Sequence, residues 1–164
     1  MFRSVALPEG LPGRLLLHSM PGRREPLAAA WREAAREEVS LIVRLTGLAE
    51  IGAKSPSYAA ALIAGQVPFA ILPLDIPDFG VPADCSGFLD AVRLVAQRIR
   101  DGEAVLVHCG AGIGRTGTFA TAVLLGLGES IDAATRAVWA AGSGMETPAQ
   151  NAFIDSCAPQ LGAA

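Results

Sequence analysis

The feature that most constrains the fold is the continuous stretch from Ala104 to Leu127. It opens with an apolar run over 104–107 that predicts a short buried strand. A loop with three glycines follows, and an apolar segment over 118–127 is long enough for a buried helix. Such a loop, lying between a strand and a helix N-terminus, turns backbone N–H groups toward an anion. The stretch therefore predicts an α/β fold with an anion-binding loop at the end of one strand.

Two reactive side chains flank this loop. Cys109 stands where the strand ends, and Arg115 stands where the helix begins. An anion cradle favours the thiolate form of a cysteine placed in it, and a guanidinium can bind two oxygens of one phosphate. A thiolate that faces a bound oxyanion is a nucleophile directed at phosphorus. The chemistry predicted from these residues is attack on a phosphate ester.

Three other interpretations of the loop fit the sequence less well. Gly112, Gly114 and Gly117 also spell the G-x-G-x-x-G fingerprint of dinucleotide-binding folds, but no second strand ending in an acidic residue follows. A Walker loop would need lysine where Arg115 stands. A purely structural, inert Cys109 would leave the adjacent arginine unexplained.

The loop resembles that of a known family. His108-Cys109, five residues and Arg115-Thr116-Gly117 match the His-Cys-x5-Arg-[Ser/Thr] pattern of protein tyrosine and dual-specificity phosphatases. The resemblance implies Cys109 as nucleophile, Thr116 as a hydrogen-bond donor to its sulfur, and His108 as a residue that orders the loop. It also implies that phosphate binds to the loop residues Gly110, Ala111, Gly112, Ile113, Gly114 and Arg115.

A second loop offers the general acid that a phosphatase of this kind needs to protonate the leaving oxygen. Residues 76–82 resemble the I-x-D-x-G-x-P loop of kinase-associated phosphatases, which makes Asp78 the acid. Asp78 lies 31 residues before Cys109, close to the usual separation in dual-specificity enzymes. Asp75 remains the alternative, and Asp84 is better explained as the N-cap of the next helix.

A third segment, over 142–153, resembles the Q-T-x-x-Q-x-x-[F/Y] segment of the same family. Glu146 stands where the first glutamine usually lies, and Gln150 matches the second. The resemblance implies that one of these side chains positions the hydrolytic water. Cys85 is either a partner for oxidised Cys109 or, as we prefer, an ordinary small residue near a helix start.

The rest of the chain alternates strands and helices. Strands are predicted over 14–18, 39–45 and 67–74, and helices over 26–38, 57–64, from Asp84 to about 100, over 133–141 and over 148–157. This alternation predicts an α/β fold with a mainly parallel central sheet flanked by helices. The resemblance makes this a protein tyrosine phosphatase-like fold of the compact dual-specificity type. We expect one domain over 1–164, with an irregular segment over 1–13 that holds at most one edge strand.

The amino-acid composition limits the classes of partner and the cellular location that we expect for this chain. A net charge of −3 gives no global basic field, so we expect neither nucleic acid nor a membrane as a partner. Three scattered cysteines suit a reducing compartment, and no leader-like or membrane-spanning run is present, which predicts a cytoplasmic protein. We expect a monomer that needs no cofactor or metal, and the Ala and Gly content suggests a bacterial source. The pair Arg23-Arg24 is either solvated or a rim that attracts a phosphorylated partner, and we favour the first.

The predicted function is hydrolysis of phosphotyrosine, with phosphoserine and phosphothreonine as further substrates, through a phosphocysteine on Cys109. The phosphorylated protein or peptide is the expected partner. The loop over 110–114 contains no lysine, which makes phosphoinositides weaker candidates. The alternatives are a non-catalytic module that binds phosphoproteins and a phosphatase for a non-protein phosphate ester. A redox switch at Cys109 is a third hypothesis, which is compatible with phosphatase activity.

Overall fold

The computed structural model describes residues 1–162. A five-stranded sheet with the order β1-β2-β5-β3-β4 forms its centre, and every neighbouring pair is parallel except β1 and β2. The strands are β1 (Arg3–Ser4), β2 (Arg14–His18), β3 (Val39–Arg44), β4 (Ala70–Pro73) and β5 (Ala104–His108). The predicted α/β fold with a mainly parallel sheet is therefore confirmed.

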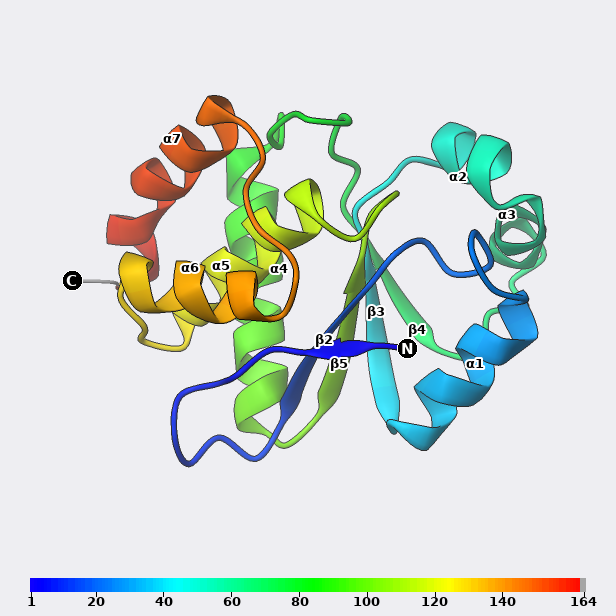
Figure 1. The fold of residues 1–164 in the computed structure, drawn as a ribbon, viewed down its shortest axis with the longest axis horizontal. Coiled ribbons are helices and arrows are strands. Elements are labelled where there is room, and N and C mark those ends of the chain that lie inside the picture. Colours follow the sequence, from blue (N-terminus) through cyan, green and yellow to red (C-terminus); the bar gives the residue numbers. More distant parts are fainter. Residues whose placement is uncertain (163–164) are drawn as a thin grey trace.

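Helices cover both faces of the sheet. The helices are α1 (Leu27–Arg36), α2 (Leu48–Lys54), α3 (Pro56–Ile63), α4 (Cys85–Arg100), α5 (Gly114–Gly126), α6 (Ile131–Ala140) and α7 (Pro148–Cys157), and a 3₁₀ turn, η1, spans Ala158–Leu161. Figure 1 shows α1, α2 and α3 on one side of the sheet and α4 to α7 on the other. Among residues 1–162, no helix is long and apolar enough to cross a membrane.

The predicted strand–loop–helix stretch forms the centre of the fold. Every residue of β5 is buried, and so are the residues of α5 from Gly114 to Leu125. An apolar strand between two neighbours and an apolar helix behind it bury the most surface when they pack together. The larger core cluster, which includes Phe88, Val107 and Phe119, accordingly joins the sheet to α4 and α5. This packing fixes the ends of the loop between β5 and α5.

The boundaries of the helices and strands show where the local sequence was sufficient to predict the start or end of an element. Asp84 caps α4 by accepting a hydrogen bond from the N–H of Gly87, as predicted, and Ser130 caps α6 in the same way. The strand predicted over 67–74 is shorter, because Pro68 has no N–H to donate to a ladder. The helix α2 was not predicted: it has only seven residues, and only Ile51 in it is buried. Such a short element gives no helical hydrophobic period.

Candidate active site

The carboxyl ends of the parallel strands meet at one edge of the sheet. His18 of β2 and Arg44 of β3 are both in register with His108, the last residue of β5. The phosphatase-like loop, residues 109–115, leaves β5 at this edge, and the loop that contains Asp78 leaves β4 at the same edge, with β3 between the two strands. In a parallel α/β sheet, ligands bind at the carboxyl ends of the strands. The topology therefore brings the two predicted loops together.

The loop after β5 is tightly folded around the sulfur of Cys109. The side chain of Cys109 is buried, and its Sγ accepts a hydrogen bond from the N–H of Gly112 at 3.2 Å. Gly112 has a φ of +76°, in the left-handed region, and a β-carbon there would collide with the carbonyl of His18. Glycine at this position is thus required both by the conformation and by the neighbouring strand.

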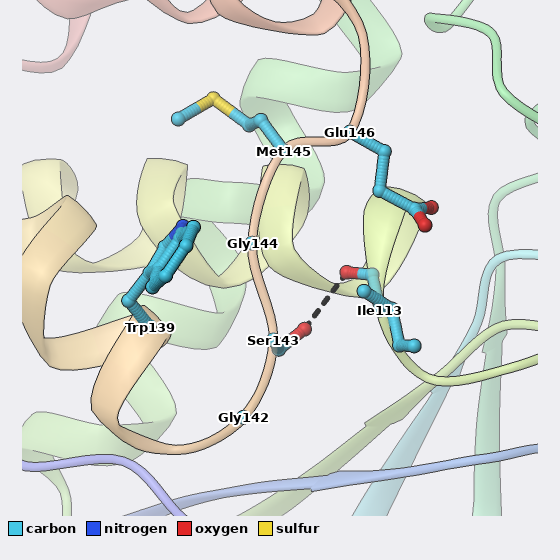
Figure 2. A pocket seen from close by; sticks show the side chains of 7 residues that line it. All are labelled: Ile113, Trp139, Gly142, Ser143, Gly144, Met145 and Glu146. Carbon is cyan, nitrogen blue, oxygen red and sulfur yellow. Dashed lines mark hydrogen bonds between the residues drawn. The ribbon is translucent and has the colours of Figure 1, made fainter.

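Carbonyl groups of this loop are held from outside by side chains distant in sequence. Arg3 donates to the carbonyl of Gly112 at 2.5 Å and also binds the carbonyls of Ala141 and Gly142. Ser143 donates to the carbonyl of Ile113 at 2.8 Å (Figure 2). In a trans peptide the N–H points opposite to the carbonyl. Binding these carbonyls on the outside therefore turns the following N–H groups toward the inside of the loop.

Arg23 also binds a carbonyl group of this loop from outside. Its guanidinium donates to the carbonyl of Gly110 at 2.7 Å, while Arg24 makes no such bond and lines a neighbouring cavity. The pair is exposed, as the solvated interpretation predicted, but one member supports the loop. Neither of the two interpretations of this arginine pair included a contact between Arg23 and the loop.

Arg115 lies in the first turn of α5 with its side chain only 2% exposed. Its guanidinium binds both carboxylate oxygens of Glu50, at 2.8 and 2.9 Å, and one oxygen of Asp78 at 2.8 Å. It also donates to the carbonyl of Ile76 at 3.0 Å. A buried guanidinium needs such partners, because desolvation of the free cation is costly. The predicted phosphate-binding arginine and the predicted general acid are thus in direct contact.

Glu50 of α2 is the site residue that sequence reasoning missed. Besides Arg115 it binds Lys54 at 2.6 Å, and Lys54 lies 3.7 Å from Asp78. The hydrogen bond from Arg115, followed by that from Lys54, lowers the pKa of Glu50 from 4.5 to about 2, against the opposing effect of burial. The only sequence signal was the Glu50–Lys54 spacing of four residues, which occurs on many exposed helices.

The two candidate acids have different surroundings. Asp75 binds Arg44 at 2.9 Å and makes no ion pair with Arg115 within residues 1–162. Asp78 lies on the guanidinium of Arg115, next to the phosphatase-like loop. The geometry therefore favours Asp78 over Asp75 as the residue that reaches a phosphate ester.

His108 is fully buried behind the nucleophile. Its Nδ1 lies 3.3 Å from the carbonyl of Cys109, and its Nε2 lies 3.0 Å from the hydroxyl of Tyr58. A carbonyl can only accept, so Nδ1 carries the proton and Nε2 accepts from Tyr58. Burial lowers the pKa of His108 to about 3, which keeps the ring neutral at physiological pH. This arrangement supports an ordering role rather than proton exchange.

One predicted contact is not seen, and Cys85 lies beside another cysteine than Cys109. The hydroxyl of Thr116, expected to bind the sulfur of Cys109, is buried and has no hydrogen-bond partner within residues 1–162. The sulfur accepts a hydrogen bond from the backbone N–H of Gly112 instead. Cys85 neighbours Cys157. Burial raises the pKa of the Cys157 thiol to about 11, and the electrostatic effect of Cys85 raises it in the same direction. Its position agrees with the preferred interpretation of Cys85 as an ordinary residue near a helix start.

The two residues predicted to position water have different environments. Gln150 is buried, and its amide accepts from the N–H of Glu146 at 2.7 Å and donates to the carbonyl of Gly80 at 3.2 Å. It therefore ties the start of α7 to the loop of Asp78, and both of its polar groups are engaged. The carboxylate of Glu146 lies against Gly114, where a β-carbon would collide with it. Of the two, Glu146 is the side chain placed beside the phosphatase-like loop.

No group of three or more His, Cys, Asp or Glu side chains within residues 1–162 is arranged to hold a metal ion. Glu50, Lys54, Asp78 and Arg115 form one connected set of ion pairs beside the loop. This arrangement can bind a phosphate on the guanidinium, present a thiol to it and supply a carboxyl group at its side.

Comparisons with known proteins agree with this chemistry. A family model described as "Polymorphic toxin system, DSP-PTPase phosphatase" matches residues 18–129, more than half of the chain. Tyrosine-protein phosphatase non-receptor type 4 of Mus musculus is 56% identical over 46 residues, which are 27% of this chain and 5% of that protein. Tyrosine-protein phosphatase 2 of Dictyostelium discoideum is 51% identical over 43 residues, 26% of this chain and 11% of that protein. The matches thus span a small part of these relatives.

Solved structures give the same result for the fold. Kinase associated phosphatase, crystallised with its catalytic site cysteine substituted by serine, superposes with a TM-score of 0.83 at 17% identity, over 100% of this chain and 97% of that one. Tk-PTP in its active form superposes with a TM-score of 0.73 at 26% identity, over 96% and 97% of the two chains. With the family model, these matches show that the chain belongs to the DSP-PTPase phosphatase family described from polymorphic toxin systems.

Proposed function

We propose that this chain hydrolyses phosphotyrosine in proteins or peptides, and phosphoserine and phosphothreonine as further substrates, through a phosphocysteine on Cys109. The observation that carries the proposal is the convergence of three groups. The sulfur of Cys109 lies inside a loop whose carbonyls are bound from outside, and Arg115 and Asp78 meet at its rim. Nucleophile, phosphate ligand and acid are the parts that such a reaction needs.

In the first step, the thiolate of Cys109 attacks phosphorus in line with the leaving oxygen, and an S–P bond replaces the P–O bond. Arg115 and the inward N–H groups of the loop hold the remaining phosphoryl oxygens, where negative charge develops. A bound phosphate displaces Asp78 from Nη2 of Arg115, while Glu50 keeps its two bonds to Nη1 and Nη2. The displaced carboxyl group, in its protonated form, donates its proton to the leaving oxygen.

In the second step, water attacks the phosphocysteine, Asp78 takes a proton from that water, and the thiolate and inorganic phosphate are released. Glu146 lies beside the loop and is the proposed residue that orients this water. His108 stays neutral and fixes the carbonyl of Cys109. Thr116 remains a proposed donor to the sulfur once the intermediate has formed, since its buried hydroxyl has no other partner within residues 1–162.

The test is release of phosphate from p-nitrophenyl phosphate in EDTA and a reductant between pH 5 and pH 8. Wild type is expected to turn over and Cys109→Ser is not, with Cys85→Ser as the control that removes a thiol outside the site. Turnover by Cys109→Ser would remove Cys109 as the nucleophile. A wild type that binds phosphotyrosine peptides without hydrolysing them would support the non-catalytic binding module.

The setting of the reaction is part of the proposal. The three cysteines are free thiols, which suits a reducing compartment such as the cytoplasm. We propose a monomeric enzyme whose partner is its phosphorylated substrate. Matched peptides with phosphotyrosine, phosphoserine and phosphothreonine, assayed beside inositol phosphates, would distinguish protein from non-protein esters.

A further inference from the structure

A cavity of about 320 Å³ lies beside the phosphatase-like loop. Figure 2 shows the segment from Gly142 to Met145 crossing it, with Trp139 on one side and Ile113 and Glu146 on the other. Ile113 belongs to the loop itself, so one wall of the cavity is formed by the proposed phosphate-binding site. A substrate whose phosphate is bound over Cys109 therefore passes close to the cavity.

The walls of this cavity are apolar and open to solvent. Trp139 is 71% exposed and Ile113 is 39% exposed, although both are large apolar side chains. The floor is built of backbone: a β-carbon on Gly144 would lie 2.7 Å from the indole nitrogen of Trp139, so the ring rests directly on the glycine. Ser143 points its hydroxyl away, to the carbonyl of Ile113. The surface that remains is suited to a nonpolar group.

The charges around the cavity narrow the class of ligand. Glu146 lies at its edge, which disfavours a carboxylate or a second phosphate. A second cavity, of about 500 Å³, shares Ile113 and Gly142 with the first, and the charged side chains of Arg3, Arg24 and Glu25 line it. An apolar cavity next to a charged one fits an extended peptide, whose successive side chains differ, better than a uniform acyl chain.

We propose that the cavity between Ile113 and Trp139 binds a large apolar side chain of the substrate, within a few residues of the phosphorylated one. This inference rests on the proposed function and adds a sequence preference to it. Burying part of such a side chain against Trp139 raises kcat/KM by about tenfold over alanine, given roughly 25 cal/mol per Å² of apolar surface.

The test is a set of phosphotyrosine peptides with Leu, Phe, Ala, Asp or Lys at each of the three positions before and after phosphotyrosine. The readout is the ratio of kcat/KM between Leu or Phe and Ala at each position, measured on one enzyme preparation so that a general loss of activity cancels. Wild type is expected to give a ratio of about ten at one position. Trp139→Ala is expected to bring it to about one, and Ile63→Ala, a control at an exposed position of α3, to leave it at ten.

Each outcome has a separate meaning. Wild type that hydrolyses p-nitrophenyl phosphate but gives ratios near one everywhere would overturn the subsite and leave the phosphatase standing. A preference that survives in Trp139→Ala would also overturn it. Flat peptide ratios together with a Trp139-dependent gain for an acyl-chain phosphoinositide over its headgroup would show a lipid occupant instead. No hydrolysis of p-nitrophenyl phosphate at all would count against the proposed function itself.

Discussion

The pair formed by Glu50 and Arg115 allows a prediction of stability. Glu50→Gln keeps the shape of the side chain and removes its charge, which leaves the buried guanidinium with Asp78 as its remaining carboxylate partner. Folding lowers the pKa of Glu50 from 4.5 to about 2, and a change of one pKa unit corresponds to 1.36 kcal/mol. The whole change in pKa would correspond to a loss of about 3 kcal/mol in the free energy of unfolding. Because the Glu50 side chain is 21% exposed, solvent screening reduces the expected loss to about 2 kcal/mol at pH 7.

The same pair predicts a pH dependence with a definite sign. A carboxyl group whose pKa is lower in the folded state contributes its stability above pH 4.5, and loses it as the pH falls from 4.5 toward 2. The difference between wild type and Glu50→Gln is therefore expected to be constant from pH 6 to 8 and to shrink steadily below pH 4.5. The measurement is the free energy of unfolding from urea titrations at several pH values.

A matched control separates this effect from the loss of any carboxylate. Glu38→Gln removes the same charge from a side chain that is 88% exposed and lies 4.0 Å from Arg14. It is expected to change the free energy of unfolding by less than about 0.5 kcal/mol. If Glu50→Gln is as stable as Glu38→Gln at pH 7, or if its deficit persists unchanged at pH 3, the reasoning about the buried guanidinium is wrong.

Three further predictions concern the reaction and the support of the loop. Asp78→Asn is expected to slow hydrolysis of alkyl phosphates by about 100-fold and activated aryl phosphates far less, whereas the same pattern in Asp75→Asn would reassign the acid. Arg3→Ala is expected to lower kcat by about tenfold and to slow alkylation of Cys109 by iodoacetamide, since the loop loses a charged donor; unchanged alkylation would contradict this. Tyr58→Phe is expected to cost about 1–2 kcal/mol in urea unfolding, because buried His108 loses its donor, and no loss would argue against that hydrogen bond.

Much of the fold could be predicted because the relevant signals were local. The apolar run of β5, the three glycines after it and the apolar α5 occur in one continuous stretch, so strand, loop and helix follow from sequence alone. The cap at Asp84 is equally local. Short α2 was missed because a seven-residue helix with one buried side chain leaves no periodic pattern.

The unpredicted parts of the site come from long-range contacts. Glu50 meets Arg115 across 65 residues, and Arg3 reaches Gly112 across 109, from a segment whose composition indicates a loop with at most one edge strand. Nothing in the local sequence links an edge strand to the carbonyl of a glycine in another loop. Tyr58 and His108 are likewise joined only once α3 packs beside β5. These contacts depend on tertiary packing, which local propensity does not encode.

The most direct test of the account is to trap the covalent intermediate. Wild type is mixed with a phosphotyrosine peptide, quenched in acid within the first turnover, digested at low pH and mapped by mass spectrometry. The account predicts one phosphoryl group on the peptide that contains Cys109, and none on that peptide in Cys109→Ser. A phosphoryl group on any other residue, or steady turnover by Cys109→Ser, would contradict it.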